Sequence, residues 1–164
     1  MRVFKFGGAS VKDAEGVINV VKVLNEMGHE DTLVVVSAMG KSTNAFEGVV
    51  DAYFEDPDSC KAALHDLEMF HQEIVKTLFN GAHGPVAKRV KNLCAQCDTF
   101  LANNRSPHRA FVYDQVVSFG ELLSTSIICA YLNHVGIAAE WVDARSCIKT
   151  VSYTHLTLPT ILPV

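Results

Sequence analysis

The spacing of apolar and polar residues predicts that the chain begins with alternating strands and helices. Residues 3–6 form a short, largely apolar run, and residues 32–36 form a continuous run rich in β-branched side chains. The second run is typical of a strand that is covered on both faces in a parallel sheet. Between them, residues 13–27 carry apolar side chains at helical spacing, and Gly28 follows where a helix C-terminus favours glycine. This order predicts a strand–helix–strand unit.

Helical spacing recurs through most of the remaining chain. One helix is expected around Phe46 and Val49, and further helices are expected at residues 60–79, 86–101, 110–118 and 122–135. The helices between residues 60 and 101 carry no evident chemistry, so we interpret them as an insertion that covers one side of the sheet or as a surface for a partner chain. His71 lies on an apolar stripe there and is interpreted as a core histidine. Residues 138–142 are expected to form a third buried strand.

The end of the first strand carries residues suited to binding an anion. Gly7 and Gly8 remove the side chains that would keep a ligand from the backbone, and a strand that runs through glycines into a helix gathers several N–H groups. Lys5 lies near the end of this strand, where its ammonium could meet a phosphoryl group. Ser10 could cap the following helix or donate to a phosphate oxygen. The segment matches neither the P-loop nor the dinucleotide fingerprint, and a Gly-Gly pair alone is also typical of an ordinary turn.

A second loop of small and polar residues, at residues 37–44, follows the second strand. Ligands of open α/β sheets bind at the carboxyl ends of the strands, so this loop is expected beside the glycine loop. Within it, Thr43 or Asn44 could simply cap the next helix. Glu121 is expected to open a later helix, where the helix dipole favours a carboxylate for structural reasons alone.

Three segments resemble the aspartate kinases, in the same order along the chain. Residues 5–11, Lys-Phe-Gly-Gly-Ala-Ser-Val, are similar to the opening signature of that family, which commonly has threonine where this chain has Ala9. Residues 36–44, Val-Ser-Ala-Met-Gly-Lys-Ser-Thr-Asn, and residues 117–124, Val-Ser-Phe-Gly-Glu-Leu-Leu-Ser, look like two further segments of the family. The resemblance covers about residues 2–150, the N-terminal portion of the family's kinase domain.

This resemblance implies an α/β fold of the amino acid kinase type, a three-layer sandwich around an open, mostly parallel sheet, truncated partway through that sheet. It implies transfer of the γ-phosphoryl group of ATP, with Mg²⁺, to the β-carboxylate of L-aspartate, which forms 4-phospho-L-aspartate for the biosynthesis of lysine, threonine, methionine and diaminopimelate. The full-length enzyme is expected to be a homo-oligomer. The sequence lacks the family's later phosphate loop, nucleotide-base pocket and regulatory domains, so the chain alone is expected to have little or no kinase activity.

The resemblance also implies roles for individual residues. Lys5 would be the catalytic residue that neutralises charge on the transferred phosphoryl group. The ATP phosphates would be held by Lys5, Gly7, Gly8 and Ser10. Aspartate would be positioned by Ser37, Thr43 and Glu121. In this arrangement the Glu121 carboxylate would meet either Lys5 or the ammonium group of the substrate.

Two alternatives stay open. One is another amino acid kinase, similar to glutamate 5-kinase, although the Ser-Thr-Asn and Phe-Gly-Glu segments argue against it. The other is a non-catalytic module that binds anions or dimerises through its helical insertion.

Charge and composition exclude other classes of function. The formal net charge is −4, without the basic excess expected of a protein that binds nucleic acid or an anionic membrane. No charged-then-apolar leader precedes Arg2 and no apolar run approaches bilayer length, so we expect a cytoplasmic protein without a membrane partner. The five cysteines do not suggest a disulfide framework. Cys94 and Cys97 lie in a helical pattern without further ligands, so no metal site is expected, and the other three are interpreted as small apolar residues.

The last segment differs in character from the rest. Residues 151–164 contain no charged side chain, and Pro159 and Pro163 disfavour a helix or a central strand. The aspartate kinases continue differently after Thr150. We therefore interpret residues 1–150 as the N-terminal part of an amino acid kinase domain and residues 151–164 as a non-native tail like a translated sequencing adaptor, with a divergent native extension as the alternative.

Overall fold

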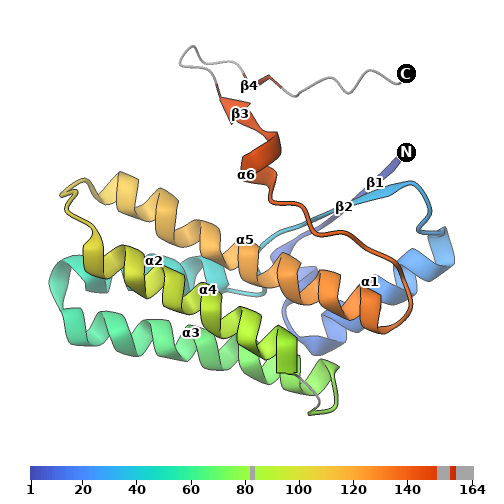
Figure 1. The fold of residues 1–164 in the computed structure, drawn as a ribbon, viewed down its shortest axis with the longest axis horizontal. Helices are drawn as coiled ribbons and strands as arrows, with labels where there is room; N and C mark the ends of the chain where they lie inside the picture. Colours follow the sequence, from blue (N-terminus) through green and yellow to red (C-terminus); the bar gives the residue numbers. More distant parts are fainter. Residues whose placement is uncertain (82–83, 151–155, 158–164) are drawn as a thin grey trace.

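The computed structural model describes residues 1–81, 84–150 and 156–157 (Figure 1). The chain begins with β1 (Arg2–Phe6), the short 3-10 helix η1 (Gly8–Val11), α1 (Ala14–Met27) and β2 (Thr32–Val36). The two strands pair in parallel, with Lys5 opposite Val35. This arrangement confirms the predicted strand–helix–strand unit and the α/β class.

Local chemistry accounts for the limits of α1. The carboxylate of Asp13 accepts a hydrogen bond from the backbone N–H of Gly16 at 2.8 Å, which caps the first turn. Gly28 follows the last turn with φ +80°, a conformation that favours glycine. The helix buries its predicted apolar stripe, which includes Val17, Val20 and Leu24.

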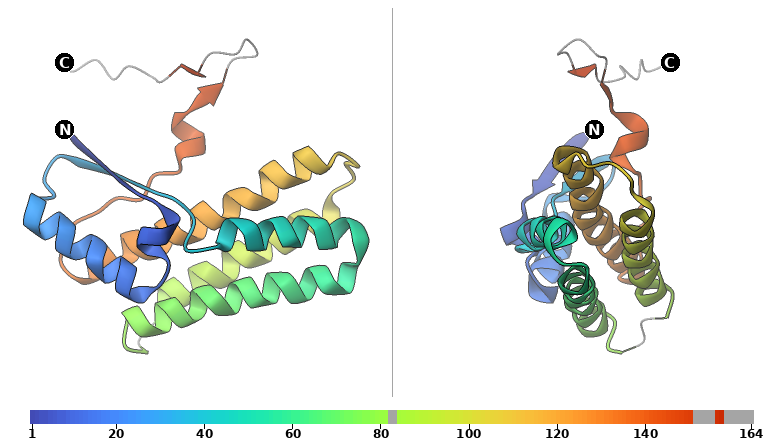
Figure 2. Two further views of the ribbon diagram at one scale, coloured as in Figure 1. Left: turned by 180° about the vertical axis from the view of Figure 1, so that it is seen from behind. Right: turned by 90° about the vertical axis from the view of Figure 1, so that its left-hand side faces the viewer.

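Long helices make up most of the described chain after β2. They are α2 (Ser42–Glu55), α3 (Pro57–Leu78), α4 (Gly84–Asn103) and α5 (Arg109–His134). Each packs against the next along the chain, and α2 also packs against α5, which closes a four-helix layer beside the strands (Figures 1 and 2). The helices expected at residues 60–79 and 86–101 are thereby confirmed with slightly different bounds. His71 is fully buried within this layer, as expected of a core histidine.

One face of the β1–β2 sheet packs on helices, and the other does not within the described residues. Val36 on the inner face is buried with Leu24 of α1 and Ile128 of α5. On the outer face, Leu33 is 48% and Val35 44% exposed. The expectation that β2 is covered on both faces is therefore wrong for the described part of the chain. A continuous apolar run indicates that both faces of a strand can be buried, but distant segments of the chain decide whether each face is covered.

The region around Glu121 corrects a second expectation. Residues 109–134 form one uninterrupted helix, so the predicted break between residues 118 and 122 does not exist and Glu121 lies inside α5. Gly120 lies inside this helix, where it allows close packing. A Cβ atom at Gly120 would lie 3.0 Å from the Cβ of Ala38 and 3.5 Å from the ring of Phe46. The glycine lets α5 approach α2 and the loop before it.

The length of α5 also corrects the expectation about apolar runs. Among the described residues, it is the one helix that is long and apolar enough to cross a membrane. Length and composition do not separate such a segment from the core helix of a globular domain. Val116, Leu123 and Ile127 of α5 are fully buried in this fold, and half of the apolar stretch of the helix is buried in total. Packing within the helical layer accounts for its composition.

Residues 138–142 do not form the expected third strand. The side-chain amide of Asn133 satisfies the backbone of Ala139, because its oxygen accepts from the Ala139 N–H at 3.2 Å and its NH₂ donates to the Ala139 carbonyl at 2.8 Å. The indole N–H of Trp141 donates to the hydroxyl of Thr125 at 2.9 Å. Side chains of α5 thus hold this segment in place of a neighbouring strand.

The described chain ends with short elements, namely α6 (Ala144–Cys147), β3 (Lys149–Thr150) and β4 (Leu156–Thr157). The last two pair in an antiparallel manner. Most of the segment interpreted as a non-native tail, at residues 151–155 and 158–164, lies outside the described residues.

Candidate active site

Two loops meet at the carboxyl ends of β1 and β2, as the sequence predicts. The backbone N–H of Gly40 donates to the carbonyl of Gly8 at 3.0 Å, and the N–H of Ser37 donates to the carbonyl of Phe6 at 3.0 Å. A Cβ atom at Gly8 would lie 2.7 Å from the carbonyl oxygen of Ala38. A side chain at Gly8 would therefore separate the two loops.

Lys5 lies over the glycine loop. Its side chain is exposed, and a Cβ atom at Gly7 would lie 3.7 Å from its Nζ atom. The ammonium group therefore lies beside Gly7 and is accessible to a ligand. Lys5 and Glu121 form no ion pair in the described part of the chain, so their predicted direct contact is not made here.

Ser10 lies in η1 and is exposed. Its side chain does not cap a helix, because Asp13 caps α1 and η1 follows Gly7 without a side-chain cap. The first of the two roles suggested for Ser10 is therefore wrong. A hydroxyl that donates to a phosphate oxygen stays a prediction.

Glu121 reaches the second loop from the middle of α5. The backbone N–H of Ala38 donates to its Oε1 atom at 3.4 Å, a long hydrogen bond. Since Glu121 lies well inside the helix, the dipole at a helix N-terminus does not explain its position. The structural explanation that the sequence suggests for this carboxylate, stabilisation at a helix N-terminus, is therefore wrong.

Thr43 lies in the first turn of α2 and is half-buried. Neither Thr43 nor Asn44 caps this helix, because Lys41 is the N-cap residue and no side-chain cap bond is made. The helix N-terminus, with its partial positive charge, is therefore left without an acidic or hydroxyl cap. Ser37, at the start of the same loop, is also half-buried.

The fold thus brings most of the predicted site residues to one edge of the sheet. The glycine loop with Lys5 and the loop with Ser37 are in direct contact, and α5 adds Glu121. Sequence reasoning missed Ser124, which is fully buried and whose hydroxyl donates to the Ser37 carbonyl at 2.9 Å. The available signal was its spacing, because a residue three positions after Glu121 lies on the same face of a helix.

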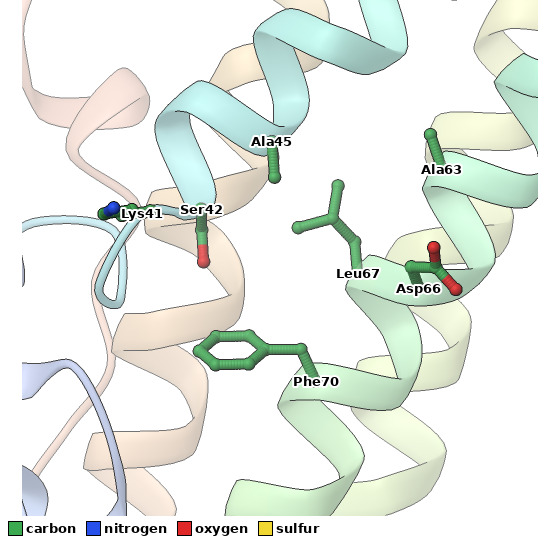
Figure 3. A pocket seen from close by; sticks show the side chains of 7 residues that line it. All are labelled: Lys41, Ser42, Ala45, Ala63, Asp66, Leu67 and Phe70. Carbon is green, nitrogen blue, oxygen red and sulfur yellow. The ribbon is translucent and has the colours of Figure 1, made fainter.

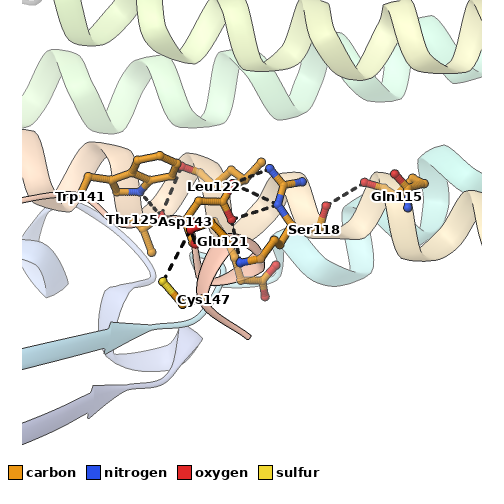
Figure 4. Close-up of polar contacts among 10 residues, drawn as sticks. Gln115, Ser118, Glu121, Leu122, Thr125, Trp141, Asp143 and Cys147 are labelled. Carbon is orange, nitrogen blue, oxygen red and sulfur yellow. Dashed lines mark hydrogen bonds and ion pairs between the residues drawn. The ribbon is translucent and has the colours of Figure 1, made fainter. Parts of the chain in front are cut away.

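A second group of polar contacts links α5 to the residues that follow it (Figure 4). The hydroxyl of Thr125 donates to the backbone carbonyl of Glu121, and Trp141 donates to Thr125. Asp143 accepts from the guanidinium of Arg145 at 2.7 Å, which lowers the pKa of its carboxyl group. The Trp141 bond ties the segment after α5 to the turn that follows Glu121, whereas the bonds between Asp143 and Arg145 are local to that segment.

A cavity of about 350 Å³ opens between α2 and α3 (Figure 3). Its lining is mostly apolar, with the ring of Phe70 facing Ser42 and the side chain of Leu67 facing Ala45. The hydroxyl of Ser42 is already used, because it donates to the Met39 carbonyl at 2.6 Å. None of the predicted site residues lines this cavity, although Lys41 and Ser42 of its lining directly precede Thr43.

The cysteines are explained by packing, with one exception. Burial raises the pKa of Cys94 and of Cys97 to about 12, and both thiols lie in the helical layer. Cys60 is buried in the same layer, and Cys129 is partly buried. Cys147 is exposed, so its interpretation as a small apolar residue is wrong. The described residues contain no cluster of three potential metal ligands, and the expected lack of a metal site stays a prediction for the whole chain.

Comparisons with known proteins assign the family. The model of the amino acid kinase family matches residues 1–161. The chain is 32% identical over 150 residues to "Aspartokinase 3, chloroplastic" of Arabidopsis thaliana, and the alignment covers 87% of this chain and 25% of that protein. It is 26% identical over 148 residues to "Bifunctional aspartokinase/homoserine dehydrogenase 2" of Escherichia coli, and that alignment covers 90% of this chain and 18% of that protein.

The fold is similar to a solved structure of E. coli aspartokinase III in complex with aspartate and ADP. The TM-score is 0.80 at 22% identity, over 93% of this chain and 33% of that chain. The chain thus spans a quarter or less of the two relatives and a third of the solved structure. At this level of identity the solved structure supports the fold, while the family match covers nearly the whole chain. This chain therefore belongs to the amino acid kinase family.

Proposed function

We propose that the chain is part of an aspartate kinase, which transfers the γ-phosphoryl group of ATP to the β-carboxylate of L-aspartate and forms 4-phospho-L-aspartate. The observation that carries the proposal is the reach of the Glu121 carboxylate from α5 to the Ala38 N–H, at the loop that touches the glycine loop. A negative group thereby lies close to the loop that we propose to bind the phosphates. Such a pair suits a substrate that carries an ammonium group at one end and accepts a phosphoryl group at the other.

The phosphate side of the site is formed by β1 and the glycine loop. ATP supplies the phosphoryl group as a substrate. The Lys5 ammonium, which lies beside Gly7, would neutralise the negative charge that this group carries. The loop at Gly7 and Gly8 would bring its backbone N–H groups to the phosphate oxygens, because no side chain stands in between. Ser10, exposed at the same loop, would donate its hydroxyl.

The aspartate side of the site is formed by the second loop and α5. Glu121 would bind the α-ammonium group, and its charge would keep the ATP phosphates on the opposite side. Thr43 lies at the uncapped N-terminus of α2, so its hydroxyl and the first N–H groups of the helix are suited to a substrate carboxylate. Ser37 would complete the contacts. Phosphoryl transfer needs mainly this positioning and charge neutralisation, and no covalent intermediate on the protein.

Magnesium, location and assembly belong to the proposal as well. Mg²⁺ is usually bound by nucleotide phosphates with one or two carboxylates, and the described residues offer no ligand cluster of their own. We therefore propose that Mg²⁺ would arrive with ATP. The cytoplasmic location, the homo-oligomer of the full-length enzyme and the division of the chain at residue 150 stay predictions.

The alternatives differ in their ligands. An enzyme similar to glutamate 5-kinase would prefer L-glutamate, whereas the relatives described above are named as aspartokinases. A non-catalytic module would bind nucleotide without supporting turnover. Because the chain spans only part of its relatives, we propose that it has little or no kinase activity alone.

The proposal is tested by nuclear magnetic resonance of the ¹⁵N-labelled chain. ADP is expected to shift the amides of Gly7 and Gly8, and L-aspartate is expected to shift those of Ala38 and Thr43. Succinate, which lacks the ammonium group, should shift them much less. Glu121→Gln should weaken the response to aspartate about tenfold or more, because a charged hydrogen bond is lost.

Glu26→Gln provides the matched control, because Glu26 is an exposed carboxylate on α1, away from the loops. It should leave both responses unchanged. An equal response to aspartate and succinate, or a Glu121→Gln variant that responds like the unmodified chain, would contradict the proposed function.

A further inference from the structure

Ser124 is a fully buried polar residue of α5 whose hydroxyl bonds to a distant part of the chain. Its Oγ atom lies 2.9 Å from the Ser37 carbonyl oxygen and 3.2 Å from the Glu121 carbonyl oxygen. A serine hydroxyl has one proton to donate, so the two carbonyls compete for it. A bond to a carbonyl one turn back is common for serine in helices, but the shorter contact here runs to the loop after β2.

The Ser37 carbonyl and the Ala38 N–H belong to one peptide group. The carbonyl accepts from Ser124, and the N–H donates to the Glu121 carboxylate at 3.4 Å. In a planar trans peptide these two groups point in opposite directions. Two side chains three residues apart on α5 therefore hold the two ends of the same peptide group, which fixes its rotation.

The neighbouring contacts leave this peptide group little freedom to move. The Ser37 N–H donates to the Phe6 carbonyl at 3.0 Å, which ties the loop to the end of β1. On the other side, the Cβ atom of Ala38 packs closely on α5, because a Cβ atom added at Gly120 would lie only 3.0 Å from it. Ala38 itself is only 2% exposed. Rotation of the peptide group would break both bonds to α5 and separate the part-buried Ser37 carbonyl from the Ser124 hydroxyl.

We infer that Ser124 is a positioning residue, which clamps the Ser37–Ala38 peptide group so that Glu121 and Ser37 are held in place for an ammonium-bearing substrate. The substrate role rests on the proposed function, whereas the clamp rests on the hydrogen bonds alone. Ser124 does not touch the substrate in this account. It acts through the peptide group that Glu121 also contacts.

The clamp is tested by amide hydrogen exchange in the complete chain. Ser124→Ala should speed the exchange of the Ala38 amide about tenfold, because the part-buried hydrogen bond to the Ser37 carbonyl is removed and this peptide group is less firmly held. Ser124→Cys, which retains a weaker donor, should give an intermediate rate. Exchange at buried Val20 in α1 should not change in either variant. If Ser124→Ala does not fold, Ser124→Cys decides alone, since an Ala38 rate equal to that of the unmodified chain would overturn the clamp.

Ser126 offers a matched control on the same helix. Its Oγ atom is buried and has no hydrogen-bond partner among the described residues, so Ser126→Ala removes a hydroxyl without removing a bond. This variant should leave the Ala38 rate unchanged. A rise equal to that of Ser124→Ala would mean that any lost hydroxyl on α5 loosens the loop, which would also overturn the clamp.

Ligand titrations separate a positioning role from a merely structural one. Ser124→Ala should weaken L-aspartate binding about tenfold and leave ADP binding within about twofold, because only the second loop is released. Equal weakening of both ligands would overturn the positioning role. If the unmodified chain binds no aspartate, the proposed function fails, and the Ala38 exchange rates still decide whether the clamp exists.

Discussion

Gly8→Ala is the substitution that most directly challenges the contact between the two loops. The new Cβ would lie 2.7 Å from the Ala38 carbonyl oxygen and 3.0 Å from the Gly40 carbonyl oxygen. Both are backbone atoms, so the strain cannot be relieved by rotating a side chain. The backbone of Gly8 has no positive φ, so the expected effect comes from the lack of space and not from a forbidden conformation.

The magnitude follows from two contributions. Overpacking of this kind costs about 1–3 kcal/mol. Separation of the loops would also lose the hydrogen bond from the Gly40 N–H to the Gly8 carbonyl, which contributes about 1 kcal/mol. The free energy of unfolding should therefore fall by about 2–4 kcal/mol, which corresponds to about 5–15 °C in Tm for a chain of this size.

Thermal and urea unfolding followed by circular dichroism measure this loss. Gly48→Ala is the matched control, because Gly48 lies on the exposed side of α2 with no atom within 4 Å of a new Cβ. It should raise the free energy of unfolding by up to about 1 kcal/mol through helix propensity. If Gly8→Ala unfolded at the same temperature as the unmodified chain, the close contact between the loops would be refuted.

Two further predictions concern the helical layer. Burial lowers the pKa of His71, so the folded chain favours its neutral form. The contribution of His71 to the free energy of unfolding is therefore fully present above its unfolded pKa of about 6.5. Below that pH, the free energy of unfolding should decline by at most about 1.4 kcal/mol per pH unit. Urea unfolding at several pH values checks this, and His71→Met should flatten the decline between pH 6.5 and 5; an unchanged slope would exclude His71 as its source. Cys147 is exposed while burial raises the pKa of Cys94 and Cys97 to about 12, so a thiol reagent at pH 8 should modify Cys147 rapidly and the other two only after unfolding. Mass spectrometry of the modified peptides reads this out, and rapid labelling of Cys97 in the folded chain would contradict the packing described for α4.

The parts of the fold that sequence reasoning predicts are those fixed by local periodicity. The apolar stripes of α1, α3 and α4 recur at helical spacing, and each is buried against the layer as that spacing requires. The meeting of the two loops also follows from sequence, because parallel strands joined by a helix bring their carboxyl ends to one edge.

The errors arise where a distant contact decides the local structure. The sequence predicts a break between residues 118 and 122, but α5 continues through them, and Gly120 packs closely on Ala38 and Phe46. Residues 138–142 have the composition of a strand, but Asn133 bonds the backbone of Ala139 and Thr125 accepts from the indole of Trp141. No spacing along the chain reveals these partners in advance.

The candidate site shows the same division. Lys5 and the two glycines are found from a contiguous motif, whose geometry the strand end determines. Ser10 and Thr43 each had a capping role as an alternative, and Asp13 at α1 and Lys41 at α2 occupy those positions instead. Ser124 was missed because its hydroxyl acts on a residue 87 positions away.

The most direct test of the central claim is a chimera in which residues 1–150 replace the matching N-terminal part of E. coli aspartokinase III. Aspartate-dependent ATP consumption is measured once circular dichroism has established that the chimera is folded. We expect turnover with L-aspartate and little with L-glutamate. Lys5→Ala should lower kcat about a hundredfold or more, since charge stabilisation at the phosphoryl group is removed. Lys22→Ala, at an exposed position of α1, should retain full activity. A folded chimera that consumes no ATP with aspartate, or that is equally active after Lys5→Ala, would contradict the account.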